Sequence, residues 1–576
     1  MIMPGNIHLH QNQEHHFVIN GITNTVPDKS DEKDQERGNW SRKLDYMMSC
    51  LSYVVGLGSV WRFPYICYRN GGEMSFGQFA SSGVASVWKA SPIFEGVGWA
   101  MLLSSFFLCI YYNMIIAYAI YYLFASLKET LPWQECGEWS SEACSNVRTD
   151  VVKNCTDNGG VFCYEKCFYH KDVSSNTLEN VSDCSIRDPV SPSGEYFHKA
   201  VLGITNDIYD MGSIKWELAL CLLLAWVIVC VWLAKGIKSN AKAAYFTVIF
   251  PYLVLSILLV RSLSLKGSVD GIFYFLKPQW HKLLGARVWG DAAVQAFKSL
   301  SLCLGGHITL SSYNKFHNNC LKDAVTVSAI ACLTCVFSGV VIFGIIGYMA
   351  AELNQPIDEV VQAGTGLAFI VYPDVVTKLP ISQLWSSLFF TMLIARGFGC
   401  QISFVSTVHT TLLDKFPKLF RKNRKRRKLL LIGVACICYL IGLTFTFQGG
   451  MYVLQLFDNY AATFSLLVIG VVESIALSWV YGGDRFLTDI ESMLGYRPRS
   501  IWVWCWRIVV PVAIMSIKFL CKADTEWGPI KKNWKNECIG LKQVPSVDLP
   551  FCITLPDIDL RSVVVKDRQD KLCQRL

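Results

Sequence analysis

Three long stretches of the chain contain no charged residue. Residues 96–127, 324–351 and 429–457 lack Asp, Glu, Lys and Arg. Each is longer than the roughly 20 residues that an α-helix needs to cross the hydrocarbon core of a bilayer. Only 17% of the 576 residues are charged, whereas about 25% is typical of soluble proteins. The sequence therefore predicts an all-α polytopic membrane protein.

Reading the whole chain for apolar length gives about ten spans. They are predicted at 46–68, 96–127, 218–234, 243–260, 288–310, 324–351, 384–412, 429–447, 454–479 and 501–520.

The loops between these spans predict the orientation. Residues 415–428 hold nine Lys or Arg, and smaller basic groups lie at 235–242, 315–322 and 485–499. Cytoplasmic loops are enriched in positive charge, so these four belong inside the cell. The net charge of +8 is explained by this clustering and does not indicate nucleic-acid binding.

The long segment 128–215 has the opposite character. It carries glycosylation triplets that begin at Asn154 and Asn180, which predicts an extracellular loop. Six of the 23 cysteines lie there, in an oxidising compartment. Cys136–Cys144 is a candidate disulfide, and the other pairings stay open.

Glycine interrupts two of the predicted spans. Gly56 and Gly58 lie in the first, and Gly305 and Gly306 lie in the span at 288–310. Glycine in a helix interior costs about 1 kcal/mol, so such pairs favour a break. Broken helices are tolerated in a membrane where they line a cavity, and their free backbone groups bind substrates and ions. Close helix packing is the alternative explanation for either pair.

Several motifs together resemble the neurotransmitter:sodium symporter family. The likeness runs from about residue 39 to 507 and is greatest to the glycine transporters and the neutral-and-basic amino-acid transporter. The motifs lie at residues 52–65, 70–72, 76–79, 111–113, 311–320 and 479–482.

The resemblance implies an inverted-repeat fold with twelve helices, of which the first and sixth are discontinuous. It implies symport of a small, glycine-like amino acid with Na⁺ and Cl⁻ across the plasma membrane. We accordingly expect a disordered cytoplasmic tail over 1–40, a transporter core over 41–520 and a C-terminal tail over 521–576. Membrane lipid is an expected partner, nucleic acid is not, and a homo-oligomer is compatible with the family.

The resemblance also implies site residues. Gly56 stands where monoamine transporters have an aspartate, which leaves room for a substrate carboxylate, and Tyr112 matches the tyrosine that holds it. The implied substrate residues are Val54, Gly56, Leu57, Gly58, Tyr112, Ser299 and Ser301. The implied sodium residues are Ser52, Val54, Val55, Ser59 and Ser299, the chloride residues Gln295 and Ser299, and the external gate pair Arg62 and Glu473.

The chain departs from the family at the ion sites. Ala331 replaces an asparagine ligand and Gly399 an aspartate, and Arg396 and Lys298 are added cations. One interpretation is that a tethered guanidinium replaces the second sodium ion. The alternative is drift in a chain that no longer transports, or an error in the predicted gene.

Two family helices are missing. Glu73 follows Gly72 where a second helix is expected, and the twelfth helix is absent near residue 520. Loss of one span would put every later basic loop on the wrong side of the membrane. Either the segment 46–68 enters the membrane and returns at its glycine break, or residues were lost through splicing or gene prediction and the product is inactive.

Two classes of function remain. The first is sodium- and chloride-dependent symport. The second is a non-transporting relative that senses an amino acid or binds a membrane partner. An enzyme is not expected, because the chain lacks a His-Glu-x-x-His motif, a phosphate-binding loop and a nucleophile elbow.

Overall fold

The structure is a computed structural model. It describes residues 39–55, 70–141, 144, 160–163, 166–169, 190–205, 207–285, 288, 299–353, 356–357, 367–420, 423–458 and 465–511. Most of the predicted tail 1–40 and all of the predicted tail 521–576 lie outside these residues.

Long apolar helices dominate the described part of the chain, and six of them are long and apolar enough to cross a membrane. They are α4 (Glu95–Ala125), α8 (Trp216–Ala234), α9 (Ile237–Leu263), α13 (Cys320–Leu353), α16 (Ser382–Lys415) and α18 (Arg424–Gly442). Each coincides with a predicted span, which confirms six of the ten.

Shorter elements occupy the remaining predicted spans and the loops. The α-helices are α2 (Lys43–Val54), α3 (Asn70–Ala80), α7 (Pro192–Glu195), α10 (Ser268–Leu276), α12 (Gly306–Ser311), α15 (Tyr372–Thr377), α17 (Pro417–Phe420), α19 (Gly450–Leu456), α20 (Ser465–Ile475), α21 (Gly483–Leu494) and α22 (Ile501–Trp504). The 3₁₀ helices are η2 (Val87–Ala90), η3 (Pro92–Phe94), η5 (Trp280–Leu284) and η7 (Leu443–Thr446). The π-helices are η4 (Tyr196–Leu202), η6 (Leu367–Val371), η9 (Ala476–Val480) and η10 (Cys505–Val509).

One feature is not helical. Strands β1 (Gly160–Cys163) and β2 (Lys166–Tyr169) form an antiparallel pair in the long loop. The sequence did not predict it, because each strand has only four residues.

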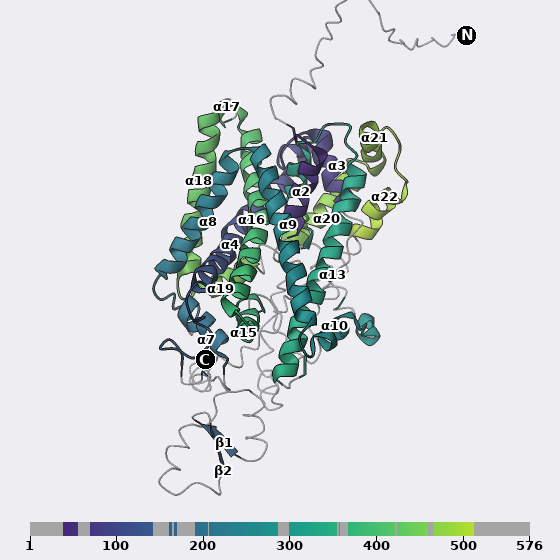
Figure 1. The fold of residues 1–576 in the computed structure, drawn as a ribbon. Coiled ribbons are helices and arrows are strands. Elements are labelled where there is room, and N and C mark those ends of the chain that lie inside the picture. The colour runs from purple at the N-terminus through teal and green to yellow at the C-terminus, as the bar shows by residue number, and fades with distance from the viewer. Residues whose placement is uncertain are drawn as a thin grey trace, which may run out of the picture. The chain divides into compact units, whose positions relative to one another are not determined.

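Helix α16 lies at the centre of the bundle and packs against α4, α9 and α2 (Figure 1). Helices α8, α9 and α18 instead turn large apolar side chains outward: Leu220 is 54% exposed, Leu253 54% and Leu440 64%. Repeated exposure of this kind is unfavourable in water and is expected where a helix faces lipid.

Helices α2 and α3 begin and end at the same end of the bundle. At the start of α2, the Trp40 backbone N–H donates to the Tyr313 carbonyl at 3.2 Å. Near the end of α3, Gln78 Nε2 donates to the Asn318 carbonyl at 2.7 Å. The twelve residues of α2 are only about 18 Å long at 1.5 Å per residue, shorter than the hydrocarbon core. Helix α2 alone is therefore too short to cross the membrane, and the start of α2 and the end of α3 lie at one end of the bundle.

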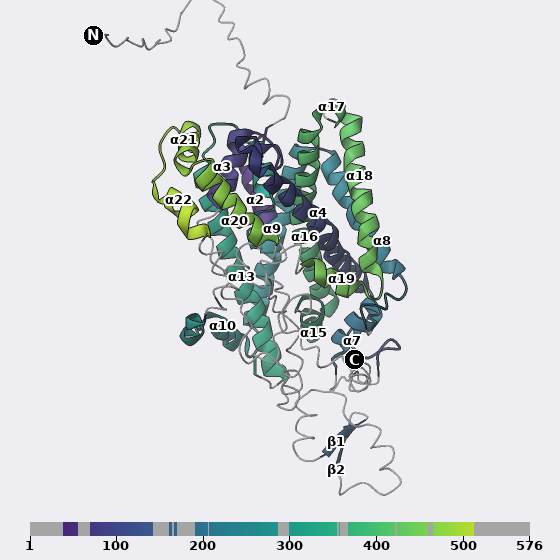
Figure 2. The ribbon, with the colours of Figure 1, turned by 180° about the vertical axis from the view of Figure 1, so that it is seen from behind.

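The two ends of the bundle differ in composition. Helix α17 lies within the basic segment 415–428, and α21 covers part of the basic segment 485–499. Both helices lie at one end of the bundle together with α2 and α3 (Figures 1 and 2). Helices α7, α10 and α15 lie at the opposite end in both views. Among the described residues, the basic helices α17 and α21 therefore lie at the end opposite to α7, which belongs to the segment 128–215 (Figures 1 and 2).

Candidate functional site

The first candidate element is the end of α2. The helix stops at Val54, and Val55 has left the helical region with φ −83° and ψ 62°. This is immediately before Gly56, where the break was predicted. Gly56, Leu57, Gly58, Ser59 and Arg62 lie outside the described residues.

The second element is a sharp turn between Ser299 and α12. Ser301 and Cys303 have positive φ angles of 51° and 61°, and Gly305 has 73°. Residues other than glycine rarely adopt a positive φ angle, so contacts with the rest of the protein hold the turn rather than local backbone preference. The predicted break in this span is therefore present, upstream of the glycine pair.

The two breaks contact each other directly. The Tyr53 hydroxyl donates to the Ser301 carbonyl at 3.1 Å, and the Ser301 hydroxyl donates to the Tyr53 carbonyl at 3.4 Å. Gly306 permits this approach, because a Cβ there would lie 2.2 Å from the Tyr53 ring. The end of α2 and the turn before α12 thus meet at one point in the interior, where the family resemblance implies substrate and ion binding.

Tyr112 lies one aromatic ring away from this point. It comes from α4, is half-buried, and contacts the ring of Phe404 edge-on at 5.7 Å between centroids. Phe404 in turn contacts Tyr53 edge-on at 5.4 Å. The structure therefore places Tyr112, Val54 and Ser301 around the meeting point of the two breaks.

The predicted second sodium position is closely packed. The Cys400 thiol donates to the carbonyls of Ser52 and Tyr53 at 3.5 and 3.1 Å. Gly399 lies against Ser52, whose hydroxyl is 2.8 Å from that of Thr247. Sodium prefers oxygen ligands, and here residue 399 provides no side-chain oxygen while residue 400 provides a sulfur.

A small cavity of about 20 Å³ adjoins this position. Serine, aromatic and small or aliphatic residues line it: Trp40, Ser49, Ser52, Ala244, Leu310, Tyr313, Gly399, Ile402, Ser403 and Ser406.

The other predicted ion residues are only partly described. Ser299 is half-buried at the start of the turn, and Ala331 is buried on α13 with no side-chain oxygen. Gln295 and Lys298 lie outside the described residues. The predicted chloride pair therefore stays a prediction.

Glu473 is buried in a group of three polar side chains. Its carboxylate, that of Glu73 and the thiol of Cys303 lie within 4.8 Å of one another. Glu73 also accepts a 2.7 Å hydrogen bond from the backbone N–H of Cys303, in the strained turn. Because Arg62 is not described, the gate pair Arg62–Glu473 stays a prediction.

Two acidic residues in the interior were missed by the sequence reasoning. Glu73 contacts the turn, and Asp458 accepts a 3.2 Å hydrogen bond from the hydroxyl of Tyr111, next to Tyr112. An acid within an apolar span is costly and marks a functional position. Asp458 and Glu473 both lie within the predicted apolar span 454–479, so Asp458 could have been identified from the sequence in the same way as Glu473.

Arg396 is the most deeply buried cation described. Its side chain on α16 is 1% exposed, and Nε, Nη1 and Nη2 have no hydrogen-bond partner in the described part of the chain. The groups that interact with it electrostatically are Tyr252, Cys335, Cys400 and Tyr112. None of these is a carboxylate.

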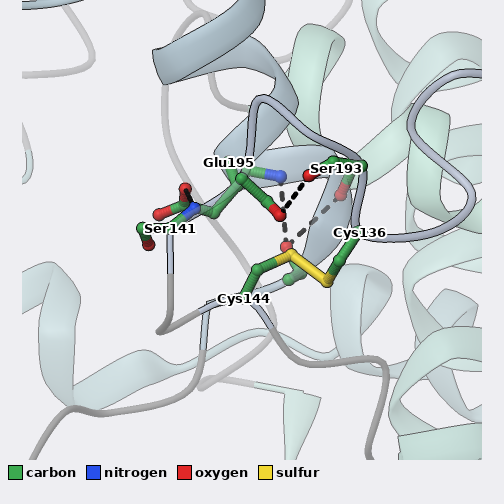
Figure 3. The surroundings of a disulfide bond; sticks show 9 residues. Cys136, Ser141, Cys144, Ser193 and Glu195 are labelled. Atoms are coloured by element: carbon green, nitrogen blue, oxygen red, sulfur yellow. Dashed lines mark hydrogen bonds between the residues drawn. A yellow bond between two sulfur atoms is a disulfide. The ribbon is translucent and has the colours of Figure 1, made fainter.

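The long segment 128–215 contains the predicted disulfide. Cys136 and Cys144 are bonded, which confirms that pairing (Figure 3). Between them, the Ser141 backbone N–H donates to the buried Glu195 carboxylate at 3.1 Å. Burial lowers the pKa of His198, in η4, below its ordinary value. Asn154 and Asn180 lie outside the described residues.

Comparison with known proteins agrees with this geometry. The model of the sodium:neurotransmitter symporter family matches residues 37–74 and 72–531. The two matched stretches meet where the sequence places the missing second helix.

Three relatives illustrate the similarity. The chain is 43% identical over 528 residues to the sodium- and chloride-dependent glycine transporter 2 of Xenopus laevis, covering 87% of this chain but only 66% of that protein. It is 42% identical to glycine transporter 1 of the same species, over 86% of this chain and 80% of the relative. It is 43% identical to the mouse neutral and basic amino acid transporter B(0+), over 84% and 79% respectively.

A solved structure supports the fold. The crystal structure of MhsT in complex with L-phenylalanine aligns with a TM-score of 0.61 at 18% identity, over 84% of this chain and 99% of that one. The predicted all-α symporter fold is thereby confirmed.

Proposed function

Because the chain belongs to the sodium:neurotransmitter symporter family, we propose that it carries a small neutral amino acid across the plasma membrane by alternating access. The observation that carries the proposal is the contact between the two helix breaks through Tyr53 and Ser301. A substrate at this junction would touch both halves of the bundle, so it can bias the equilibrium between two conformations.

The proposed substrate is glycine-like, and the proposed coupling ions are Na⁺ and Cl⁻. Glycine transporters and an amino acid transporter are among the relatives, and their names state dependence on sodium and chloride. Residue 56 is a glycine and so carries no side chain, and Tyr112 provides a hydroxyl near the junction. Small size is favoured because Tyr53 and Phe404 fill much of the surrounding volume.

The proposed orientation puts the N-terminus and the basic segments in the cytoplasm. Support comes from α2 and α3, which leave the bundle at the end where the basic helices lie. The segment 128–215 would then be extracellular, with glycosylation at Asn154 and Asn180.

Uptake of radiolabelled glycine and alanine tests the proposal. Cells expressing the chain are assayed in sodium chloride, choline chloride and sodium gluconate, with surface biotinylation to count the molecules present. We expect saturable uptake above that of mock-transfected cells. A chain that reaches the surface and takes up neither amino acid in any medium would contradict transport.

A second function is favoured by one observation. Gly399 and Cys400 pack against the end of α2 where the family holds an ion. A non-transporting amino acid sensor or partner-binding protein would tolerate this packing, because it needs no ion release. The two functions separate in the same assay, since a sensor binds glycine without accumulating it.

A further inference from the structure

The Arg396 guanidinium is a buried charge without a counter-charge in the described structure. It is 1% exposed, and none of its three nitrogens has a hydrogen-bond partner there. Arginine stays protonated in proteins, so this charge does not neutralise itself. A buried charge without a partner is strongly destabilising, and an intramembrane cation therefore indicates a ligand or partner of opposite charge.

Among the described residues, the groups that interact with Arg396 are hydroxyls and thiols from four helices, and none is a carboxylate. Tyr112 comes from α4, Tyr252 from α9 and Cys335 from α13, while Cys400 shares α16 with the arginine. The interior acids Glu73 and Glu473 gather instead around Cys303. In the described part of the chain, the charge of Arg396 is therefore left without an anionic partner.

We propose that the guanidinium of Arg396 binds a carboxylate. The planar guanidinium presents parallel N–H donors that match the two oxygens of a carboxylate. The proposal rests on the proposed amino acid function and deepens it, because it assigns the substrate's carboxylate to Arg396. The protein then supplies the positive charge itself, so binding of the carboxylate needs no sodium ion.

Thermal unfolding of the purified full-length chain in nanodiscs tests this site directly. The midpoint is measured in sodium-free, chloride-free HEPES buffer with rising glycine, acetate, glycinamide or choline chloride. Glycine and acetate carry the carboxylate, glycinamide lacks it, and chloride is an anion without its shape. We expect glycine and acetate to raise the midpoint and glycinamide to leave it unchanged.

The variants Arg396→Leu and Arg396→Gln are compared with Arg261→Leu. Arg261 lies at the exposed end of α9, where it bonds Ser264. We expect both Arg396 variants to weaken the glycine and acetate responses at least tenfold in ligand concentration, and Arg261→Leu to retain them. Without ligand, Arg396→Leu should melt above the unmodified chain, because it removes an unpaired buried charge.

The outcomes separate the two proposals. A response to acetate but not glycine, lost in both Arg396 variants, supports the carboxylate site and contradicts amino acid binding. A response that survives in both variants, an equal response to glycinamide, a response to chloride alone, or no response to glycine or acetate would overturn the carboxylate site.

Discussion

Gly399 and Ser52 are packed so closely that a single added carbon would not fit between them. A Cβ on Gly399 would lie 2.5 Å from the Ser52 hydroxyl oxygen and 3.0 Å from the Ser52 carbonyl oxygen. The Cys400 thiol holds the same carbonyl. Helices α2 and α16 therefore meet backbone to backbone at the position where the family resemblance implies a sodium ion.

Replacement of Gly399 by alanine should destabilise the chain by about 1–3 kcal/mol, the usual cost of overpacking a core. The contact includes the α2 backbone, which cannot rotate away as a side chain could. Gly433→Ala is the matched control, since it lies on α18 with nothing within 4 Å of the added carbon. Thermal unfolding of the two variants in detergent checks the prediction, and equal midpoints would contradict the packing.

The hydroxyl of Tyr53 should contribute to stability through the junction. Tyr53→Phe removes the donor to the Ser301 carbonyl while it keeps the ring, so we expect a loss of about 1 kcal/mol. Tyr209→Phe removes a hydroxyl from a residue that is 92% exposed and should have no measurable effect. Chemical unfolding of both variants distinguishes these results. An unchanged Tyr53→Phe variant would argue against the inter-break contact.

Stability should fall as pH drops below the ordinary histidine pKa of 6.5. Burial lowers the pKa of His198 in the folded chain, with Lys199 adding to the effect and Glu195 opposing it. Between the folded and unfolded pKa values, only the unfolded chain takes up the proton, and acid therefore favours unfolding. The loss stops once pH is below the folded value.

His198→Gln should weaken this dependence, measured as the unfolding midpoint at pH 7.5, 6.5 and 5.5. His281→Gln provides the control, because its side chain is exposed on η5. If the two variants show the same pH profile, His198 is not the group responsible.

The N-terminus should be inaccessible from outside the cell. A short epitope placed before Met1 should stain only after permeabilisation, because the start of α2 lies at the end of the bundle where the basic helices α17 and α21 lie (Figure 1). Enzymatic deglycosylation should lower the apparent mass of the same molecules, because it removes glycans from Asn154 or Asn180. Staining of intact cells would contradict the proposed orientation.

The spans were predictable because their signal lies in the chain itself. Residues 324–351 carry no charge, and α13 covers them. The break before α12 was predicted from Gly305 and Gly306, but the strain falls on Ser301 and Cys303, since tertiary contacts fix those angles.

Contacts between residues far apart in the chain could not be predicted from the sequence. Glu73 and the Cys303 N–H are 230 residues apart, so no local pattern indicates that they meet. The position of Arg396 could be predicted from the sequence. The absence of an acidic neighbour among the described residues could not, because that depends on three other helices. The Cys136–Cys144 pairing could be predicted because the two cysteines are only eight positions apart in the sequence.

The Cys136–Cys144 disulfide also indicates how its segment of the chain was inserted into the membrane. Thiols stay reduced in the cytosol and pair in the secretory lumen. The bridge between Cys136 and Cys144 therefore closes only in copies whose segment between α4 and α8 was translocated during synthesis. A copy threaded in the opposite sense would keep two free thiols and would lack the closed loop that holds Ser141 near Glu195. The oxidation state of these two cysteines in a mature molecule thus reports the direction in which that molecule was inserted.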